Sequence, residues 1–246
     1  MNIYGLVGRS LGHSFSEKYF FEKFEKENIA GCIYRNFELA DLEKEISELK
    51  SNRALKGLNV TIPYKTDIIS FLDEISMEAR EINACNCIKI KDGKWTGFNT
   101  DIIGFETSFV PHLKPFHRKA LILGTGGASN AVAFVLKKLN IDFLKVSRNK
   151  TESPSVISYE DISAEEMKEY QIVINTTPLG TFPNIHECPP LPYEFVTDQY
   201  YFFDLIYNPS KTLFLSLAEK QGAVIENGAQ MLAIQAEESW KIWNEN

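Results

Sequence analysis

Residues 120–129 read Ala-Leu-Ile-Leu-Gly-Thr-Gly-Gly-Ala-Ser, and this stretch decides the fold. Its apolar beginning predicts a short buried strand, and the pattern over 130–139 predicts a helix. A strand, a glycine-rich turn and a helix form the layout of a dinucleotide site: Gly124 permits the tight turn, and Gly126 lets the backbone approach the pyrophosphate at the positive end of the helix. Ser129 replaces the third glycine of the motif, so an ordinary strand–helix loop remains an alternative.

The end of the next predicted strand, 143–147, bears on the choice of nucleotide. NAD sites carry an acidic residue about 20 positions after the turn, where it accepts the ribose hydroxyls. Here Ser147 is followed by Arg148, Asn149 and Lys150, with no acid. Because a guanidinium binds phosphate oxygens through paired hydrogen bonds, this stretch favours NADP over NAD, although a solvated basic turn would look the same.

The remainder of the chain alternates predicted strands and helices. In the first half we expect strands at 3–7, 32–37, 57–61, 85–90 and 94–98, and helices at 16–28 and 41–50. In the second half we expect strands at 171–175, 201–205 and 223–226, and helices at 211–221 and 228–243. This alternation predicts an α/β fold with parallel pairing, apart from a hairpin at Asp92-Gly93. The proline-rich segment 178–198 is expected to be a long surface loop.

Composition excludes several classes of protein. The 246 residues suit one large or two small domains, and 26 basic against 33 acidic residues give a net charge of −7, which argues against a nucleic-acid binder. No apolar run is long enough to span a bilayer, and the N-terminus lacks the layout of a signal peptide. The four cysteines form no CxxC pair and the four histidines are scattered. We therefore expect reduced thiols, a cytoplasmic location, and no metal site.

Polar residues cluster where the predicted strands of the first half end, which is where open parallel sheets bind ligands. They are Ser14 and Ser16, then Asn59, Thr61 and Lys65, then Asn86, and finally Asn99, Thr100 and Asp101. Each has a structural alternative: a serine or Asp101 could cap a helix, Lys65 could be a surface lysine, and Asn86 could be a satisfied core amide. Together, hydroxyls, amides, one lysine and one carboxylate suit a small anionic polyhydroxy ligand, and a lysine–carboxylate pair can move a proton during hydride transfer.

At these residues the sequence resembles the shikimate dehydrogenase family, nearly from end to end. The resemblance is carried by Gly12-His13-Ser14-Phe15-Ser16, Asn59-Val60-Thr61-Ile62-Pro63-Tyr64-Lys65, Ala84-Cys85-Asn86, Gly97-Phe98-Asn99-Thr100-Asp101, the glycine turn 124–129, Asn175-Thr176-Thr177-Pro178-Leu179-Gly180, Asp204-Leu205-Ile206-Tyr207, and the stretch 227–236.

The resemblance implies a two-domain α/β fold: residues 1–101 and 228–246 as the substrate domain, and residues 102–227 as a Rossmann-type doubly wound NADP-binding domain. The implied reaction is the reversible reduction of 3-dehydroshikimate to shikimate by NADPH, in chorismate and aromatic amino-acid biosynthesis. By position, Lys65 and Asp101 would be catalytic. The substrate residues would be Ser14, Ser16, Thr61, Asn86, Tyr207 and Gln235. The cofactor residues would be Gly124, Thr125, Gly126, Gly127, Ala128, Ser147, Arg148, Lys150, Thr176 and Gly228.

Two departures from the family pattern and two alternatives accompany this expectation. Glu17 replaces the proline usual after the second serine, and Ile102-Ile103 follow Asp101 where the family usually has glycine. An NAD-dependent quinate/shikimate dehydrogenase would need a different pocket near the two serines. A non-catalytic NADP-binding regulator should have lost Lys65 or Asp101, and both are present. A small-molecule substrate and a monomer or homodimer are expected.

Overall fold

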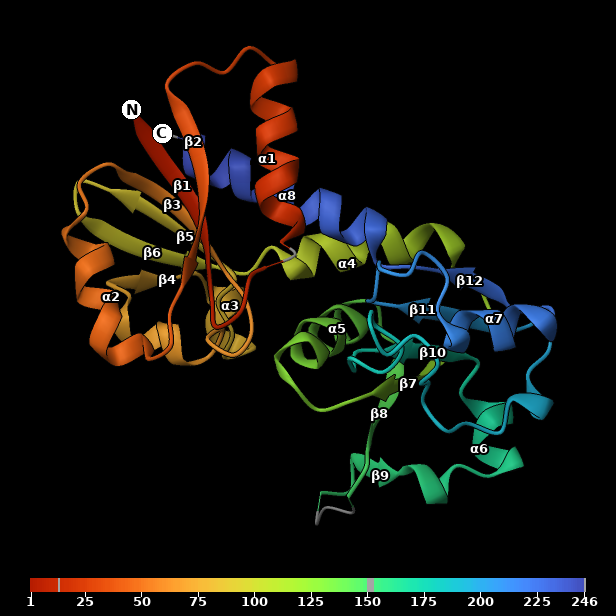
Figure 1. The fold of residues 1–246 in the computed structure, drawn as a ribbon. Helices are drawn as coiled ribbons and strands as arrows, with labels where there is room; N and C mark the ends of the chain where they lie inside the picture. The colour runs from red at the N-terminus through yellow and green to blue at the C-terminus, as the bar shows by residue number, and fades with distance from the viewer. Residues whose placement is uncertain (13, 150–152, 246) are drawn as a thin grey trace. The chain divides into compact units, whose positions relative to one another are not determined.

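The computed structural model describes residues 1–12, 14–149 and 153–245 (Figure 1). The chain divides into two compact units: unit 1 contains Met1–Thr100 and Ala236–Asn246, and unit 2 contains Asp101–Gln235. Each unit is built on its own six-stranded sheet. The division falls inside helix α8 (Ala229–Asn244), so this helix belongs to both units.

Unit 1 has a mixed sheet in the order β2-β1-β3-β5-β6-β4. Its strands are β1 (Asn2–Gly8), β2 (Cys32–Glu38), β3 (Leu55–Val60), β4 (Glu74–Ile75), β5 (Cys87–Lys91) and β6 (Lys94–Phe98). Strand β1 pairs in parallel with β2 and β3, whereas β5 is antiparallel to both β3 and β6. The expectation of parallel pairing is therefore wrong for β3 and β5, whose connection runs through short elements rather than one helical crossover.

Helices α1 (Phe15–Lys26), α2 (Leu42–Ser51) and α3 (Met77–Glu81) complete unit 1, with the 3₁₀ turn η1 (Asp67–Phe71). Asp41 caps α2, because its side chain accepts a hydrogen bond from the backbone N–H of Lys44. On α1, Phe20 and Phe24 are one helical turn apart and both buried. They share a core cluster with Tyr4 and with Trp243 of α8.

Unit 2 has a fully parallel sheet in the order β12-β11-β10-β7-β8-β9. Its strands are β7 (Lys119–Leu123), β8 (Asp142–Ser147), β9 (Val156–Ser158), β10 (Ile172–Asn175), β11 (Tyr201–Asp204) and β12 (Val224–Glu226). Counted from β7 as the first strand, this is the doubly wound order 3-2-1-4-5-6, in which the direction of winding reverses between β7 and β10. The predicted fold class is confirmed.

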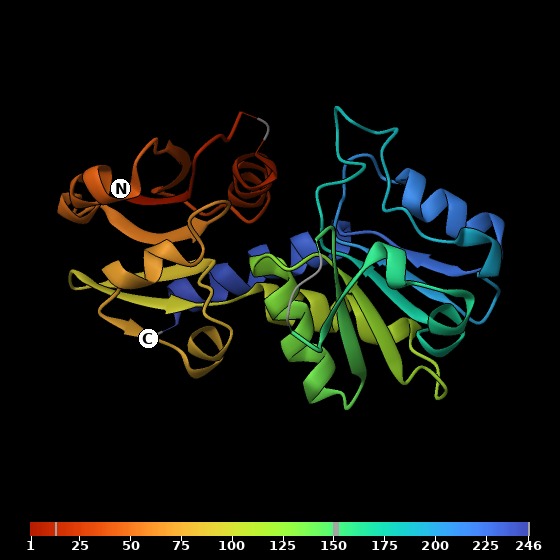
Figure 2. The ribbon, with the colours of Figure 1, turned by 90° about the horizontal axis from the view of Figure 1, so that it is seen from below.

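The helices of unit 2 are α4 (Asp101–Phe109), α5 (Gly127–Lys138), α6 (Ala164–Glu169) and α7 (Leu213–Lys220), with the turns η2 (Val110–His112), η3 (Tyr159–Asp161) and η4 (Tyr193–Phe195). Because right-handed crossovers that add strands in opposite directions place their helices on opposite faces, α5 and α7 should flank the sheet. Figure 2 shows α5 on one side of these strands and α7 on the other.

The segment 178–198 only partly fits the expected surface loop. Leu191 and Val196 are buried and belong to the same core cluster as Phe202 and Phe214. The buried side chains of Leu191 and Val196 hold the loop against unit 2. The proline-rich composition of the loop does not predict these contacts. Two short strands, β4 and β9, and the short helices α3 and α6 were also not predicted, since elements of two to six residues carry too little periodicity.

Candidate functional site

The glycine turn of unit 2 has the geometry that a dinucleotide site requires. Gly124 has a φ of +112°, and a Cβ there would lie 2.7 Å from Oγ1 of Thr176, so only glycine fits without strain. Gly126 is the N-cap of α5 and offers no side-chain cap to the helix. A Cβ on Gly126 or Gly127 would meet nothing within 4 Å. The space beside both glycines at the start of α5 is therefore open, an arrangement that lets a pyrophosphate approach the helix N-terminus closely.

Thr176 lies where the winding of the sheet reverses. Its backbone N–H and its hydroxyl both donate to the carbonyl oxygen of Leu123, at 2.9 and 2.7 Å. Leu123 ends β7 and precedes the glycine turn, so the loop after β10 is fixed against the turn. Thr125, which is exposed, and Ala128, in the first turn of α5, complete the predicted pyrophosphate contacts. Thr176 and the glycine turn, which are far apart in the sequence, therefore lie side by side in unit 2.

The residues predicted to select NADP follow β8. Ser147 is the last residue of that strand, and its hydroxyl accepts a hydrogen bond of 3.3 Å from the N–H of Asn149. Arg148 is exposed and lies near Tyr159, whose pKa is raised to about 12 by burial while the charge of Arg148 opposes the rise. An exposed guanidinium in this turn, with no acid beside it in the sequence, suits a 2′-phosphate. Lys150 lies outside the described residues.

In unit 1, Ser14 and Ser16 are at the start of α1. Ser14 is the N-cap, and its hydroxyl oxygen accepts a bond of 3.4 Å from the N–H of Glu17, as the capping alternative predicted. This bond uses the hydroxyl only as an acceptor, so its proton can still be donated to a carboxylate. Ser16 is buried and hydrogen-bonds with the phenol of Tyr34. Glu17 accepts a bond of 2.7 Å from the side chain of Asn36.

Thr61, Lys65 and Asn86 are held near the end of β3 by backbone hydrogen bonds. The N–H of Thr61 donates to the carbonyl of Val7 at 2.9 Å, and the carbonyl of Lys65 accepts from the N–H of Cys85 at 2.7 Å. The carbonyl of Asn86 accepts a bond of 2.9 Å from the N–H of Val60. The residues that follow β3 and the residue that precedes β5 therefore lie together at one end of these two strands, as the clustering of polar residues predicted.

A chain of buried neutral side chains runs beneath these residues, and we call it the unit 1 chain: Tyr34, Asn59, Ser239, Thr100 and Asn86. The phenol of Tyr34 donates to Oδ1 of Asn59 at 2.9 Å, and Nδ2 of Asn59 donates to the hydroxyl of Ser239 at 2.8 Å. The hydroxyls of Ser239 and Thr100 are 3.3 Å apart, and Oδ1 of Asn86 accepts from the N–H of Thr100 at 2.6 Å. The alternative interpretation of Asn86, an amide whose hydrogen bonds are made within the core, is therefore correct for its Oδ1 atom.

The remaining predicted residues belong to unit 2. Asp101 is its first residue and also the first residue of α4, and Gln235 is its last residue. Both side chains are buried, at 7% and 9% exposure. Tyr207 follows β11 and is exposed, and partial burial still raises the pKa of its phenol. Gly228 packs against the same loop, because a Cβ there would lie 2.1 Å from the carbonyl oxygen of Leu205.

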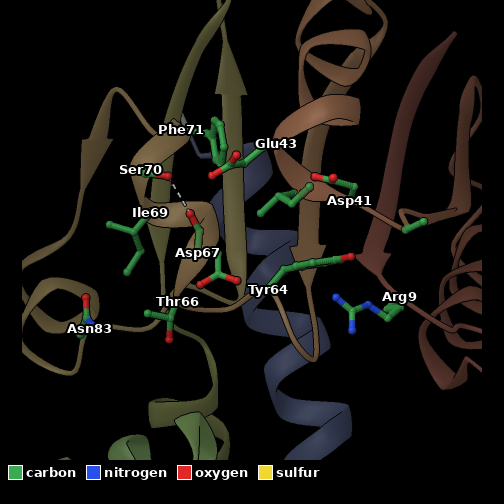
Figure 3. A pocket seen from close by; sticks show the side chains of 12 residues that line it. Arg9, Asp41, Glu43, Tyr64, Thr66, Asp67, Ile69, Ser70, Phe71 and Asn83 are labelled. Carbon is green, nitrogen blue, oxygen red and sulfur yellow. Dashed lines mark hydrogen bonds between the residues drawn. The ribbon is translucent and has the colours of Figure 1, made fainter.

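Unit 1 has a pocket of about 660 Å³, whose lining side chains are drawn in Figure 3, and none of the predicted site residues lines it. Tyr64 and Thr66, the sequence neighbours of Lys65, line it with Asp67. The guanidinium of Arg9 is 5.8 Å from the centre of the Tyr64 ring. The pocket is therefore next to Lys65 in the sequence, but Lys65 does not line it. The pocket is not the substrate site that was predicted around Lys65. A second pocket of about 540 Å³ has Ser14 in its lining, with residues of α1 and β2.

One polar cluster was missed by sequence reasoning, and we call it the Asp204 cluster: Asp204, Asn175 and Thr212. Asp204 ends β11 and is fully buried, and its carboxylate accepts from Asn175 Nδ2 at 3.0 Å, the N–H of Ile206 at 3.0 Å and the Thr212 hydroxyl at 2.6 Å. Burial raises the pKa of Asp204 to about 6, although these hydrogen bonds oppose the rise. In the sequence, this cluster is indicated only by the polar residues Asn175 and Asp204, each at the end of an apolar strand.

Among residues 1–12, 14–149 and 153–245, no group of three His, Cys, Asp or Glu side chains is placed to hold a metal ion. In the same described ranges, no helix combines the length and apolar character needed to cross a bilayer. None of the four cysteines, all of which lie within the described residues, forms a disulfide.

The doubly wound sheet and its open glycine turn define the class of nucleotide-dependent dehydrogenases with a Rossmann-type unit. The profile described as "Shikimate dehydrogenase substrate binding domain" matches residues 6–88. A shikimate dehydrogenase (NADP(+)) of Caldicellulosiruptor bescii is 39% identical over 97% of this chain and 88% of its own length. The chain belongs to the shikimate dehydrogenase family, as its motifs predicted.

Solved structures agree over the same length. A crystal structure of a shikimate dehydrogenase in complex with NADP⁺ matches with a TM-score of 0.87 and 32% identity, covering 99% of this chain and 90% of the other. The enzyme of Thermus thermophilus, in complex with NADP(H) and shikimate, matches with a TM-score of 0.86 and 28% identity, covering 99% and 94%. The match therefore spans both units.

Proposed function

We propose that this protein catalyses the reversible NADPH-dependent reduction of 3-dehydroshikimate to shikimate, a step of the shikimate pathway toward chorismate and the aromatic amino acids. The observation that carries the proposal is the family relationship over nearly the full chain, because it includes both the substrate unit and the nucleotide unit. The presence of Lys65 and Asp101 in the matching motifs argues against a regulator that has lost catalysis.

The residues of unit 1 would bind the substrate and handle its proton. Ser14 donates its hydroxyl proton to the substrate carboxylate, and Ser16 does the same once its hydroxyl turns away from the phenol of Tyr34. Thr61 and Asn86 hydrogen-bond the ring hydroxyls, and Tyr207 and Gln235 are the other residues assigned to the substrate. Negative charge develops on the carbonyl oxygen during reduction. A protonated Lys65 at that oxygen stabilises the charge and delivers the proton, and Asp101 keeps the ammonium in place.

The residues of unit 2 would hold the nucleotide. When bound, NADPH supplies the hydride that the carbonyl carbon of the substrate accepts. The N–H groups at the start of α5 receive the pyrophosphate, Gly228 lies near the nicotinamide, and Thr176 also contacts the nucleotide. Arg148 and Lys150 bind the 2′-phosphate, which distinguishes NADP from NAD.

We also place the protein in the cytoplasm, acting on a small molecule as a monomer or homodimer. Four cysteines that form no disulfide support a reducing compartment.

The test is an absorbance assay at 340 nm with purified protein, in which shikimate and quinate are each paired with NADP and with NAD. We expect turnover that is fastest with shikimate and NADP. A preference for quinate with NAD would replace this function by that of a quinate/shikimate dehydrogenase. No turnover with any pair, in a protein that still binds NADPH, would support a regulator.

A further inference from the structure

Asp204 is a buried carboxylate whose three hydrogen-bond donors are all neutral groups: an amide, a backbone N–H and a hydroxyl. A charge placed in this way destabilises a fold, because neutral dipoles replace bulk water only in part. Burial accordingly raises its pKa to about 6. A buried residue that lowers the stability of the fold is a candidate for a functional role, provided that hydrogen bonds connect it to a binding site.

The first connection of Asp204 is to the loop after β10. Its Oδ1 accepts from Nδ2 of Asn175, the last residue of that strand. Oδ1 of Asn175 in turn accepts from both the N–H and the hydroxyl of Thr177, at 3.0 and 2.7 Å. Thr176 lies between these two anchors and bonds to Leu123, beside the glycine turn. The carboxylate therefore orients the amide that sets the path of the Thr176 loop.

The second connection is to the loop after β11. The same Oδ1 of Asp204 accepts from the N–H of Ile206 at 3.0 Å, and the carbonyl of Ile206 accepts from the N–H of Gly228 at 3.0 Å. Gly228 touches the backbone of Leu205 so closely that no side chain fits. The path of residues 205–207 and the start of α8 are thus fixed through one carboxylate oxygen.

The third connection explains why the carboxylate needs both of its oxygens. Oδ2 of Asp204 accepts from the hydroxyl of Thr212 at 2.6 Å, and that hydroxyl oxygen also accepts from the N–H of Leu215 as the N-cap of α7. Thr212 holds Oδ2, so Oδ1 is turned toward the two loops. An amide at position 204 would present one acceptor oxygen instead of two and would leave one of these donors without its partner.

We propose that Asp204 is a positioning residue for the nucleotide: its carboxylate joins the loops after β10 and β11, so that Thr176 and Gly228 are held ready for NADP at the point where the sheet winding reverses. The inference rests on the proposed function, since that function assigns Thr176 and Gly228 to the nucleotide. It adds a residue that touches no ligand in this scheme and acts through Asn175 and Ile206.

The experiment measures NADPH binding by its fluorescence in the absence of substrate, together with thermal unfolding of the ligand-free protein, for the wild type and Asp204→Asn. We expect the dissociation constant for NADPH to rise about 10-fold or more, as for the loss of a hydrogen bond to a charged group. The unfolding temperature near pH 7.5 should stay level or rise, because the buried charge is gone. A residue with a merely structural role would show the reverse: lower stability and unchanged NADPH binding.

Two further variants keep the test decisive if Asp204→Asn does not fold. Thr212→Val removes only the hydroxyl that holds Oδ2 and should weaken NADPH binding several-fold, whereas Thr212→Ser keeps the hydroxyl and should bind like the wild type. Tyr200→Phe is the matched control, since it removes one buried hydrogen bond, to the carbonyl of Met167, at the opposite end of β11. It should lower stability without changing NADPH binding.

The outcomes separate this inference from the proposed function. If the wild type binds NADPH and oxidises shikimate, but Asp204→Asn and Thr212→Val bind NADPH within twofold of it, the positioning role is wrong and the function stands. If the wild type neither binds NADPH nor turns over shikimate, the proposed function itself fails, and the positioning role fails with it.

Discussion

The two units solve the same problem, a buried polar network next to a predicted binding site, in opposite ways. The unit 1 chain consists of neutral hydroxyls and amides that satisfy one another, from Tyr34 to Asn86. The Asp204 cluster of unit 2 contains a full carboxylate whose pKa is raised to about 6 by burial. A neutral network costs little once each group has its partner, whereas a buried charge remains costly.

The difference shows that unit 2 contains a buried charge that lowers its stability, whereas the unit 1 chain contains none. In unit 1 the network lies beneath residues predicted to bind hydroxyls and a carboxylate, and neutral donors and acceptors are sufficient to orient Ser16 and Asn86. In unit 2 two separate loops and one helix N-terminus must be joined at one point. A carboxylate with two oxygens can accept all three bonds, which a single neutral side chain of the same size cannot.

The largest effect is expected for Lys65→Ala in unit 1. The ammonium acts mainly on charge that develops in the transition state, so kcat should fall by about 10²–10⁴ while KM for shikimate stays within a few-fold. Binding of NADPH should be unchanged, because its predicted contacts belong to unit 2. Steady-state kinetics and a fluorescence titration check both statements. Retention of more than about a tenth of the wild-type kcat would make Lys65 a binding residue.

The charge of Asp204 predicts a pH dependence that the neutral unit 1 chain cannot produce. An ordinary aspartate titrates near 3.8 and Asp204 near 6, so the folded protein holds this proton more tightly than the unfolded chain. The contribution of this group to stability is therefore greatest below pH 4 and is lost as the pH rises through 6. At pH 7 the loss corresponds to about 3 kcal/mol.

Urea unfolding of the wild type and Asp204→Asn between pH 4 and pH 7 measures this effect. Over this pH range the difference in unfolding free energy should shift in favour of the variant by about 2 kcal/mol, whatever constant offset the lost hydrogen bond adds. A difference that does not change with pH would mean that Asp204 titrates as an ordinary aspartate. The contrast drawn between the neutral unit 1 chain and the charged Asp204 cluster would then be wrong.

Arg148→Ala tests nucleotide selection within unit 2. Removing a charged contact to the 2′-phosphate should raise KM for NADP by about 10–150-fold and leave KM for NAD within a few-fold. KM for shikimate should not change, which separates this residue from the unit 1 set. Equal losses with both nucleotides would show that Arg148 only supports the turn.

The smallest effect is expected for Tyr34→Phe, which cuts the unit 1 chain at its first hydrogen bond. Asn59 then loses a donor, and the hydroxyl of Ser16 loses the acceptor that sets its direction. Because Ser16 is no longer oriented, KM for shikimate should rise by about 3–10-fold with little change in kcat. Tyr200→Phe, which removes an equally buried phenol–carbonyl bond in unit 2, should lower stability without changing that KM. The prediction is contradicted if both variants lose stability and neither changes KM for shikimate.

Much of the fold could be predicted from local patterns. The alternation of strands and helices predicted the α/β class and most element positions within two residues, because buried strands and amphipathic helices have distinct periods. The doubly wound order was expected only from the family resemblance. The antiparallel pairing of β3 with β5 and the apolar anchors Leu191 and Val196 could not be predicted. Both depend on contacts between segments far apart in the sequence.

The candidate site divides in the same way. Gly124, Arg148 and Lys65 carry their chemistry in the residue type and spacing, so the sequence alone determined the class of ligand expected at each. Tyr34, Ser239 and Asp204 do not, since a buried tyrosine, a helical serine and a strand-end aspartate each have many ordinary roles. Only the tertiary structure decided that residues 34, 59 and 239 form one chain and that position 204 joins two loops, because hydrogen-bond partners become definite only when the backbone has brought them within about 3 Å.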